Sequence, residues 1–377
     1  MKKTIAWLLC LTLLASMTAC ARPEQQPATT ATTAPTAASR PAAEVITDSV
    51  RAQLDALMAK EGYEGIAYLT HNGKVVYQYA SGTNDQGEAL SVQSPMYVAS
   101  ISKQFCAAAI LMLRDQGKLS LDDKLEEYFP EYTIGKEITL KNLLSMRSGI
   151  VRDFLPLCNN PQQFEGKTPE EIRASSLSWL FEQPLISKPD TAFFYSNVNY
   201  TLLSYVVEIA SGQSYEDFVR HEIFEPLGLT HSGFIHETAA NPQWGLTYDA
   251  IYSFSILGDS TKGCGDIVST AGDMDIWMTA LQNGKVICEE SYREMITDHS
   301  PASRYGYGMM GGTRDGWGHN GNNKGYTARM YFNEEYSYNL FIATGKTPSF
   351  QPNYTDQVSN SLLKIVFAAE DSAAGQS

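Results

Sequence analysis

The sequence predicts an α/β (α+β) fold with two lobes: an antiparallel sheet built from both chain ends and flanked by helices, with an inserted, mostly helical lobe. Two strand-like segments come early, at residues 65–70 and 74–80, and two come late, at 326–333 and 338–344, with helical patterns between them. Strands at both ends of a chain with helices between them fit one shared sheet. The 377 residues, 43% of them hydrophobic, suffice for a large core.

The first 44 residues do not have the composition of a folded domain. A short apolar run follows two lysines, as in a signal peptide, which we place at residues 1–19. The run ends in a segment that resembles a bacterial lipobox, with Cys20 as the lipidated residue; the alternative is an ordinary signal peptide cut near Ala19. Residues 20–44, rich in Ala, Thr, Pro and Gln, predict a lipid-anchored, disordered tether. We therefore expect an exported lipoprotein on the extracellular or periplasmic face of the cell membrane.

The chain after residue 45 predicts the order helix, strand, strand. Apolar residues recur at helical spacing between Val50 and Met58, and Gly62 ends the run. Asn72-Gly73 joins the two strands and is a strong signal for a type I′ turn. The sheet is therefore expected to begin with a hairpin.

The middle of the chain predicts helices. Residues 100–113 are apolar nearly all round, so we expect a buried central helix that stops near Gly117. Apolar spacing and end signals predict further helices at residues 140–146, 197–210, 214–224 and 269–281, and after the capping box that opens at Thr168.

The end of the chain returns to strand and closes with a helix. The strands at 326–333 and 338–344 are aromatic and apolar, and residues 357–368 have helical spacing. We assign residues 45–369 to one domain and residues 370–377 to a tail.

Composition excludes one class of partner. The net charge is −14 and no basic stripe is present, so nucleic-acid binding is not expected. Cys106, Cys158, Cys264 and Cys288 follow no metal-ligand spacing, so no metal site is predicted. An exported protein can form disulfides, but the spacing leaves the pairing of these four residues open.

Ser100 and Lys103 form a Ser-x-x-Lys tetrad at the start of the predicted central helix. Residues three apart share a helix face, so the amine can lie beside the hydroxyl and act as its base. A helix N-terminus also offers a backbone N–H to an oxyanion. The tetrad alone proves little, because Ser361 and Lys364 repeat it in the closing helix, where a solvated pair is the plainer interpretation.

Tyr195 and Asn197 form a second motif, Tyr-x-Asn, just before a predicted helix. The phenol can move protons and the amide can bind a substrate amide. The plainer interpretation is an aromatic core residue followed by an Asn cap. The same pattern recurs at Tyr331 and Asn333.

His319-Asn320-Gly321 precedes a predicted strand and forms a third motif. The histidine can hold a substrate carboxylate or the tyrosine, and Gly321 lets a substrate approach the strand edge. Because imidazole has a reference pKa of about 6.5, a charged His319 would make activity depend on pH near neutrality, whereas a neutral ring would not. The similar pattern at His71 is explained by the hairpin turn.

The order Ser-x-x-Lys, Tyr-x-Asn, His-x-Gly resembles the serine β-lactamase and DD-peptidase (penicillin-binding protein-like) family, in the class C-related branch with D-peptidases and esterases. Three further segments also resemble family segments, at residues 138–149, 223–229 and 268–274. The resemblance covers residues 45–369 and implies a β-lactamase/transpeptidase-like fold.

The resemblance implies an acyl-enzyme mechanism. Ser100 would attack a carbonyl, and Lys103 and Tyr195 would handle its proton and then the leaving group. Asn197 would orient the substrate amide. The backbone N–H groups of Ser100 and Asn322 would form the oxyanion hole, and water would then hydrolyse the ester. The family needs no metal or organic cofactor.

Two departures from the family pattern bear on the substrate. Class C β-lactamases usually carry Lys at the position of His319, and a His there resembles D-peptidase and esterase-like members instead. The second departure is Met146-Arg147, where many relatives have His-Thr. We therefore expect an exported serine hydrolase acting on a small amide or ester, foremost a D-amino-acid peptide, with esterase activity nearly as well supported. The alternatives are a β-lactamase, a non-catalytic relative that binds cell-wall peptides, and an adhesin, for which no module is visible.

Overall fold

The computed structural model describes residues 45–375, except 155–156, 158–160, 247–260, 301, 324 and 349–352. The predicted signal peptide, the lipidation site Cys20 and the tether lie outside these residues. Within the described part of the chain, no helix is both long enough and apolar enough to cross a membrane.

The centre of the molecule is a six-stranded antiparallel sheet in the order β2-β1-β9-β8-β7-β6. Its strands, from one edge to the other, are β2 Lys74–Ser81, β1 Gly65–His71, β9 Tyr338–Thr344, β8 Tyr326–Asn333, β7 Trp317–Asn323 and β6 Met310–Gly311. The two N-terminal strands join the C-terminal ones where Ile66 pairs with Ala343. The predicted α/β fold with a sheet built from both chain ends is confirmed.

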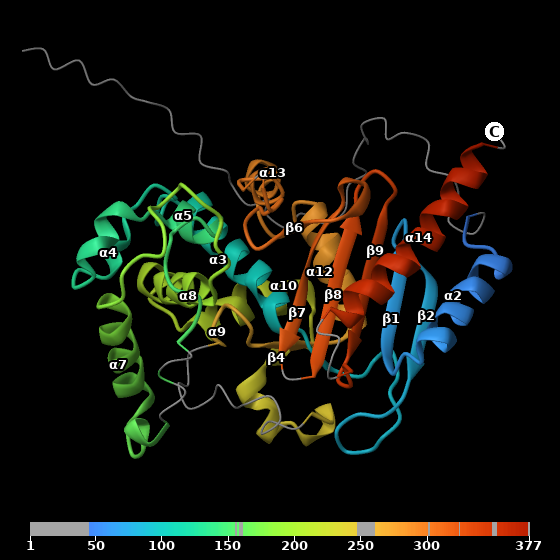
Figure 1. Ribbon diagram of the computed structural model, residues 1–377, viewed down its shortest axis with the longest axis horizontal. Helices are drawn as coiled ribbons and strands as arrows, with labels where there is room; N and C mark the ends of the chain where they lie inside the picture. The colour runs from blue at the N-terminus through green and yellow to red at the C-terminus, as the bar shows by residue number, and fades with distance from the viewer. Residues whose placement is uncertain are drawn as a thin grey trace, which may run out of the picture.

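Helices cover both faces of this sheet. On one face, α2 (Asp48–Glu61) and α14 (Tyr354–Ala374) pack together, burying Leu54, Leu362 and Leu340 in one cluster (Figure 1). On the other face, α12 (Ala271–Gln282) contacts β1 and β9 and accepts a hydrogen bond from Thr70 at Asp275, 2.7 Å long. α14 runs to Ala374, so the helix continues past the predicted domain boundary at residue 369.

The inserted lobe is mostly helical and lies beside the sheet in Figure 1. Its central helix is α3 (Lys103–Asp115), whose residues are buried from Lys103 to Leu113. The other elements between β2 and β7 are β3 Met96–Tyr97, η1 Ala99–Ser102, α4 Leu125–Tyr128, η2 Thr133–Glu137, α5 Leu140–Leu144, η3 Pro161–Phe164, α7 Pro169–Phe181, α8 Asn197–Ser211, α9 Tyr215–Val219, η4 Arg220–Phe224, α10 Glu225–Leu227, β4 Gly233–Phe234, η5 Ile235–Ala240, η6 Pro242–Trp244, β5 Ile267–Ser269, α13 Glu289–Met295 and η8 Thr313–Asp315.

Three predicted helices differ in detail from the structure. The α-helix of the first motif begins at Lys103, because Ser100 lies in the preceding 3₁₀ turn η1. The predicted helix at 214–224 is interrupted by the π-turn η4, in which the Glu225 N–H bonds to the Arg220 carbonyl, since Pro226 has no N–H to continue a regular helix. Ser269 ends the strand β5, and α12 starts only after its cap Thr270.

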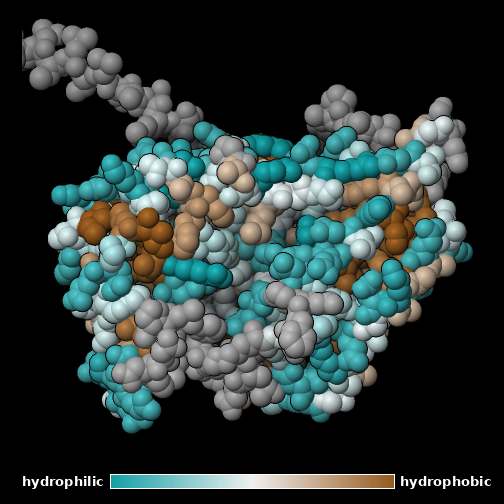
Figure 2. All heavy atoms as spheres, viewed as in Figure 1, coloured by the Kyte–Doolittle hydropathy of each residue, from teal (hydrophilic) through white to brown (hydrophobic). Residues whose placement is uncertain are grey.

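The face shown in Figure 2 is mostly polar. Two hydrophobic patches interrupt it, one over the helical lobe near α4 and one beside α14. A second sheet has three strands in the order β3-β5-β4. It was not predicted, because strands of two or three residues are too short for a readable alternation. Its position matters, since β3 leads directly into the turn that carries Ser100.

Candidate active site

Ser100 lies in η1, a tight turn whose backbone is held from several sides. Ala99, directly before it, has a φ of 47°, a left-handed conformation that is rare for a residue with a side chain. The Ser102 hydroxyl donates to the Ala99 carbonyl over 2.7 Å and accepts the N–H groups of Asp266 and Ile267 at 3.1 and 3.0 Å. These bonds fix the turn against β5, so that strain in the turn is borne by a rigid support.

Lys103 lies one helical turn after Ser100, completely buried beneath it. Its Nζ is 3.1 Å from the Ser100 hydroxyl, 2.8 Å from the Asn197 amide oxygen and 2.6 Å from the Cys264 backbone carbonyl. It also lies 5.0 Å from the centre of the Tyr195 ring. The structure therefore brings together the three residues that sequence proposed for proton transfer, with Asn197 as a fourth.

The second motif is held at the N-terminus of α8. Ser196 caps this helix by accepting the Asn199 N–H at 3.3 Å, which places Asn197 in the first turn. The Asn197 Nδ2 donates to Asp153 over 2.6 Å, and Arg152 pairs with the other Asp153 oxygen at 3.1 Å. Because its NH2 group is taken up by a carboxylate, the amide oxygen of Asn197 is turned toward the buried ammonium.

Met146 supports the second motif from behind. It is buried, has a φ of 58°, and its sulfur accepts the Ser196 N–H at 3.3 Å, while its carbonyl accepts the Phe194 N–H at 2.9 Å. Arg147 turns outward and donates to Asp190 at 2.8 Å. This gives a structural role to the Met-Arg pair that departs from the family pattern.

The third motif lies on β7, at the point where this strand meets η1. A Cβ atom added to Gly321 would come within 2.1 Å of the Val98 carbonyl oxygen and 3.1 Å of the Ala99 Cβ. Such contacts are far shorter than van der Waals separations, so only glycine permits this approach. The strand edge is thereby held against the turn of Ser100.

His319 lies behind the site and not in it. Its ring is 2% exposed, and Nδ1 lies 2.5 Å from the Asn320 carbonyl, which can only accept, so Nδ1 carries the proton and Nε2 accepts from the Tyr305 hydroxyl at 3.2 Å. Burial, with a smaller contribution from the nearby Lys103 ammonium, lowers the pKa of His319 to about 3. The ring packs 6.1 Å from that of Tyr195. Of the two alternatives that the sequence left open for His319, the structure favours the neutral ring.

A hollow of about 240 Å³ opens above Ser100. It brings together Ser100, Tyr195, Asn197, Gly321 and Asn322, five of the seven residues that sequence proposed for catalysis or substrate binding. The other lining residues are mostly amides, hydroxyls and charged groups, namely Arg152, Met310, Asn320, Thr327, Ala328, Asn353, Thr355 and Asp356. A hollow rich in side-chain amides suits a ligand that carries peptide groups.

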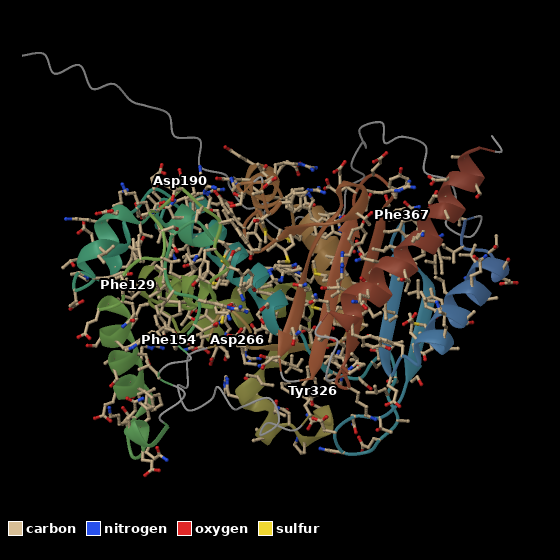
Figure 3. All side chains as sticks on the ribbon, in the orientation of Figure 1. Phe129, Phe154, Asp190, Asp266, Tyr326 and Phe367 are labelled. Carbon is tan, nitrogen blue, oxygen red and sulfur yellow. The ribbon has the colours of Figure 1, made fainter. Side chains whose placement is uncertain are left out.

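Several groups of the site were not found from the sequence. The Cys264 carbonyl carries no sequence signal, because any residue supplies a backbone oxygen. Asp153 and Tyr305 come from loops, whose approach to the motifs depends on tertiary structure alone. Asp266, which Figure 3 places between the helical lobe and the sheet, has one carboxylate oxygen on the Gly263 N–H at 2.8 Å and the other without a partner among the described residues.

Neither the cysteines nor any acidic cluster offers a metal site in the described part of the chain, where no group of three or more His, Cys, Asp or Glu side chains converges. Cys106 and Cys288 carry free thiols, whereas Cys158 lies outside the described residues. Burial raises the pKa of the Cys264 thiol to about 11 and raises that of the Cys106 thiol well above its usual value, which disfavours the reactive thiolate at both.

The family model described as Beta-lactamase matches residues 50–359 of the chain. The chain belongs to this family. The match spans all three motifs and both lobes, so the predicted membership of the β-lactamase and DD-peptidase family is confirmed.

Relatives with known sequences agree with this assignment. The penicillin-binding-protein-like PbpX of Bacillus subtilis (strain 168) is 33% identical over 258 residues, which cover 66% of this chain and 62% of PbpX. Penicillin-binding protein 4* of the same strain is 24% identical over 284 residues, covering 68% of this chain and 61% of that protein. The chain thus spans about three fifths of these relatives' length.

Solved structures share the fold. The D-amino acid amidase from Ochrobactrum anthropi SV3 superposes with a TM-score of 0.68 at 22% identity, covering 87% of this chain and 100% of the amidase. FmtA from Staphylococcus aureus gives 0.68 at 19% identity, covering 84% of this chain and 90% of FmtA. At such identities the likeness supports the fold and leaves the substrate to be argued from the site.

The repeated motifs elsewhere in the chain do not form sites. Lys364 is exposed on α14, and no hydrogen bond joins it to Ser361 among the described residues. His71 is stacked on Tyr338 at 4.2 Å next to the predicted hairpin turn. The context of each motif, and not the motif itself, separates the candidate site from these copies.

Proposed function

We propose that the protein is an exported serine hydrolase that forms an acyl-enzyme at Ser100 and acts on a small amide or ester, foremost a D-amino-acid peptide. The observation that carries this proposal is the 3.1 Å contact between the Lys103 Nζ and the Ser100 hydroxyl, in which the lysine is completely buried and also bonds to Asn197 and the Cys264 carbonyl. A buried amine at this distance is suited to take the serine proton.

The geometry around Lys103 defines where a proton can move. Two of its three neighbours, the Asn197 amide oxygen and the Cys264 carbonyl, can only accept, so they hold two N–H bonds in either charge state. The third position faces Ser100, where an ammonium donates and a neutral amine accepts. Proton exchange is thereby directed to the nucleophile alone.

The remaining steps use groups that line the same hollow. We propose that the backbone N–H groups of Ser100 and Asn322 hold the oxyanion, and that Tyr195 passes a proton to the leaving group. Asn197 would orient the substrate amide through the second N–H of its NH2 group, while the first stays on Asp153 and its amide oxygen stays on Lys103. Water then hydrolyses the ester and regenerates Ser100.

The amide-rich lining supports a peptide or amide substrate, and the relatives' names point the same way, since they include penicillin-binding proteins and a D-amino acid amidase. A dedicated β-lactamase is less well supported. The third motif offers no positive charge at neutral pH, because the His319 ring is neutral and lies behind the hollow. A β-lactam carboxylate would therefore lack a permanent cation at that place.

Labelling tests the proposal. A serine-reactive fluorophosphonate should label the wild type and the Ser361→Ala control, but not Ser100→Ala, and Ser100→Ala should lose at least about 10³-fold in kcat/KM. Intact mass after incubation with a penicillin, a D-Ala-D-Ala peptide and a p-nitrophenyl ester would identify the acyl group. Undiminished turnover in Ser100→Ala would refute the proposal, and peptide binding without any acylation would support the non-catalytic alternative.

We further propose that the enzyme is anchored through a lipid on Cys20, as the lipobox-like segment predicts. In a bacterial host, Cys20→Ala should shift the protein from the membrane fraction to the soluble one. Membrane retention of this variant would contradict the anchor.

A further inference from the structure

A second, larger groove adjoins the hollow above Ser100. It has a volume of about 770 Å³ and is lined by Gly311, Gly312, Thr313, Arg314, Arg329, Asn360, Lys364, Phe367, Ala368 and Asp371. We call it the α14 groove, because one face of α14 forms its wall; in Figure 1 this helix crosses β8 beside β6 and β7.

The two hollows follow each other along three elements. On β7 and β8, Asn320 lines the first hollow and its paired neighbour Arg329 lines the groove, and Asp356 of the first hollow lies 3.6 Å from Arg329. On α14, Asp356 lines the first hollow, whereas residues four and eight positions further along the same helix face line the groove. A ligand that fills the first hollow can therefore extend into the second.

The register of the sheet allows the distance between the Arg329 guanidinium and the Ser100 hydroxyl to be estimated. Arg329 pairs with Asn320 on the neighbouring strand, and Gly321, the next residue, lies against the turn of Ser100. With neighbouring strands about 4.8 Å apart, the Arg329 guanidinium lies roughly 10 to 15 Å from the Ser100 hydroxyl. That distance corresponds to a few residues of an extended peptide or a similar chain.

Charge distinguishes this groove from the rest of the molecule. The protein has a net charge of −14, yet the groove is lined by three cations and one carboxylate. The charge of Arg314 is neutralised, because its two Nη groups donate to the two Asp371 carboxylate oxygens at 2.9 and 2.5 Å. The positive charge that faces the groove therefore comes from Lys364 and, in part, from Arg329, whose ion pair with Asp356 is 3.6 Å long.

Neither of these two cations has its hydrogen bonds satisfied within the described part of the chain. Arg329 has a side chain only 15% exposed, and its ion pair with Asp356 is 3.6 Å long, beyond hydrogen-bond range. Asp356 instead accepts from Asn320 at 2.7 Å. Lys364 is exposed and makes no ion pair there. Because the Arg329 guanidinium donates no hydrogen bond to a described side chain, its planar fork can receive the oxygens of an anionic ligand.

We propose that the α14 groove is an anion-binding subsite that receives a carboxylate- or phosphate-bearing part of the substrate, with Arg329 as a bidentate partner and Lys364 as a second positive charge. The inference rests on the proposed function, and it narrows the substrate to a molecule with an anionic group roughly 10 to 15 Å from the scissile carbonyl. The Asp356 carboxylate, between the two hollows, would repel an anionic group, so this group must lie beyond Asp356 and inside the groove.

Matched substrates test the specificity. Three p-nitrophenyl esters of equal length would carry a carboxylate, a phosphate monoester or a neutral amide at the far end. At low ionic strength, we expect the wild type to favour an anionic ester over the neutral one by about tenfold in kcat/KM. Arg329→Gln and Lys364→Gln should each lower this ratio, and the double variant should bring it to about one. The exposed Lys118→Gln variant, which also removes one positive charge, should keep the wild-type ratio.

The two esters with anionic ends separate a carboxylate from a phosphate ligand, since the better one shows the larger ratio. Equal kcat/KM for the anionic and neutral esters in the wild type would overturn the subsite and leave the hydrolase proposal standing. Lys364→Gln changes an exposed residue, so this part of the test does not depend on whether Arg329→Gln folds.

A binding measurement is independent of catalysis. Inorganic pyrophosphate, titrated calorimetrically into Ser100→Ala, should bind at low salt, and the Arg329→Gln, Lys364→Gln double change should weaken binding at least about tenfold. If no ester is hydrolysed but this loss is seen, the groove is an anion site and the hydrolase proposal fails. Pyrophosphate binding that the double change does not affect would overturn the groove.

Discussion

Asn197 shows how the orientation of one amide controls the site. Its oxygen faces the buried Lys103 only because its NH2 group is held by Asp153 at 2.6 Å. If that partner is lost, the amide can rotate and present its NH2 group to an ammonium, which is repulsive. Asp153 is therefore a positioning residue that acts through Asn197.

We predict that Asp153→Ala lowers kcat/KM by about 10- to 100-fold, the usual effect of losing a hydrogen bond to a charged group. Asp153→Asn should retain much of the activity, because its amide oxygen can still accept from Asn197. Asp190→Ala, which removes an exposed carboxylate paired with Arg147, serves as the control and should stay near the wild type. Steady-state kinetics on one ester would decide, and equal losses in the Ala and Asn variants would contradict a positioning role.

At this scale, the sequence predicted the residues that the structure brings together, namely Ser100, Lys103, Tyr195 and Asn197, because fixed spacing along a helix carries over into space. Their catalytic roles stay predictions. It did not predict the protonation state of His319, since that depends on burial by distant residues such as Tyr305. The role of the Cys264 carbonyl could not be predicted either, because every residue has a backbone carbonyl and the sequence does not distinguish one from another.

Among the elements, β7 and η1 form the contact on which the site depends. The strand edge can approach the turn only because Gly321 lacks a side chain, and the nearest atom to an added Cβ is a backbone oxygen that cannot rotate away. The site is thus assembled by two elements from different parts of the chain.

Gly321→Ala should push β7 away from η1, lowering both the thermal unfolding temperature and activity, the latter by about 10²-fold or more, as expected when an oxyanion donor is displaced. Gly272→Ala is a matched control, because a Cβ there would meet no atom closer than 4.0 Å and alanine favours a helix. Thermal scans and kinetics on both variants would test the contact. A Gly321→Ala enzyme with wild-type activity would show that the strand need not lie so close.

Most long elements were predictable, and the short ones were not. The hairpin at Asn72-Gly73 and the capping box at Thr168 stand as expected, because local chemistry specifies them. The turn η1, the π-turn η4 and the strands of the small sheet depend on tertiary contacts, so their sequences carry little signal. Ser269 was assigned to a helix for this reason.

Across the whole molecule, two buried groups give opposite contributions to the pH dependence of stability. Burial lowers the pKa of His319 to about 3, so its contribution is complete above about pH 6.5 and is lost as the pH falls, while the unfolded chain takes up a proton. Burial raises the pKa of Asp266 to about 7, so its contribution is complete below about pH 4 and is lost as the pH rises toward 7. Between about pH 4 and pH 6.5, His319 makes the unfolding free energy rise with pH, whereas Asp266 makes it fall.

We predict that replacing either residue reveals the effect of the other on the pH dependence of the unfolding free energy. Relative to the wild type, acidification from pH 7 to 5 should cost Asp266→Asn about 2 kcal/mol of unfolding free energy and should favour His319→Gln by a similar amount. Urea unfolding at pH 5, 6 and 7 would measure both, with the exposed His221→Gln variant as control. Parallel profiles for all four proteins would show that neither group is titrated by folding.

The fold class and the family were predictable at this scale because both chain ends have strand patterns and the motif order is specific. The α14 groove was not, since Arg329 and Lys364 come from a strand and a helix whose separation in space no local pattern gives. Cys20 and the tether remain predictions outside the described residues.

The pairing of β1 with β9 also has a consequence for how the chain acquires its structure. A hydrogen bond from Thr344 to the Glu64 carbonyl spans 280 residues, and the sheet between them cannot close until the last strands have left the ribosome. Until then the early hairpin has an unpaired edge, and β7 is missing from beside Ser100. The turn that carries Ser100 is therefore made long before the strands that complete the candidate site, so the site can form only near the end of synthesis.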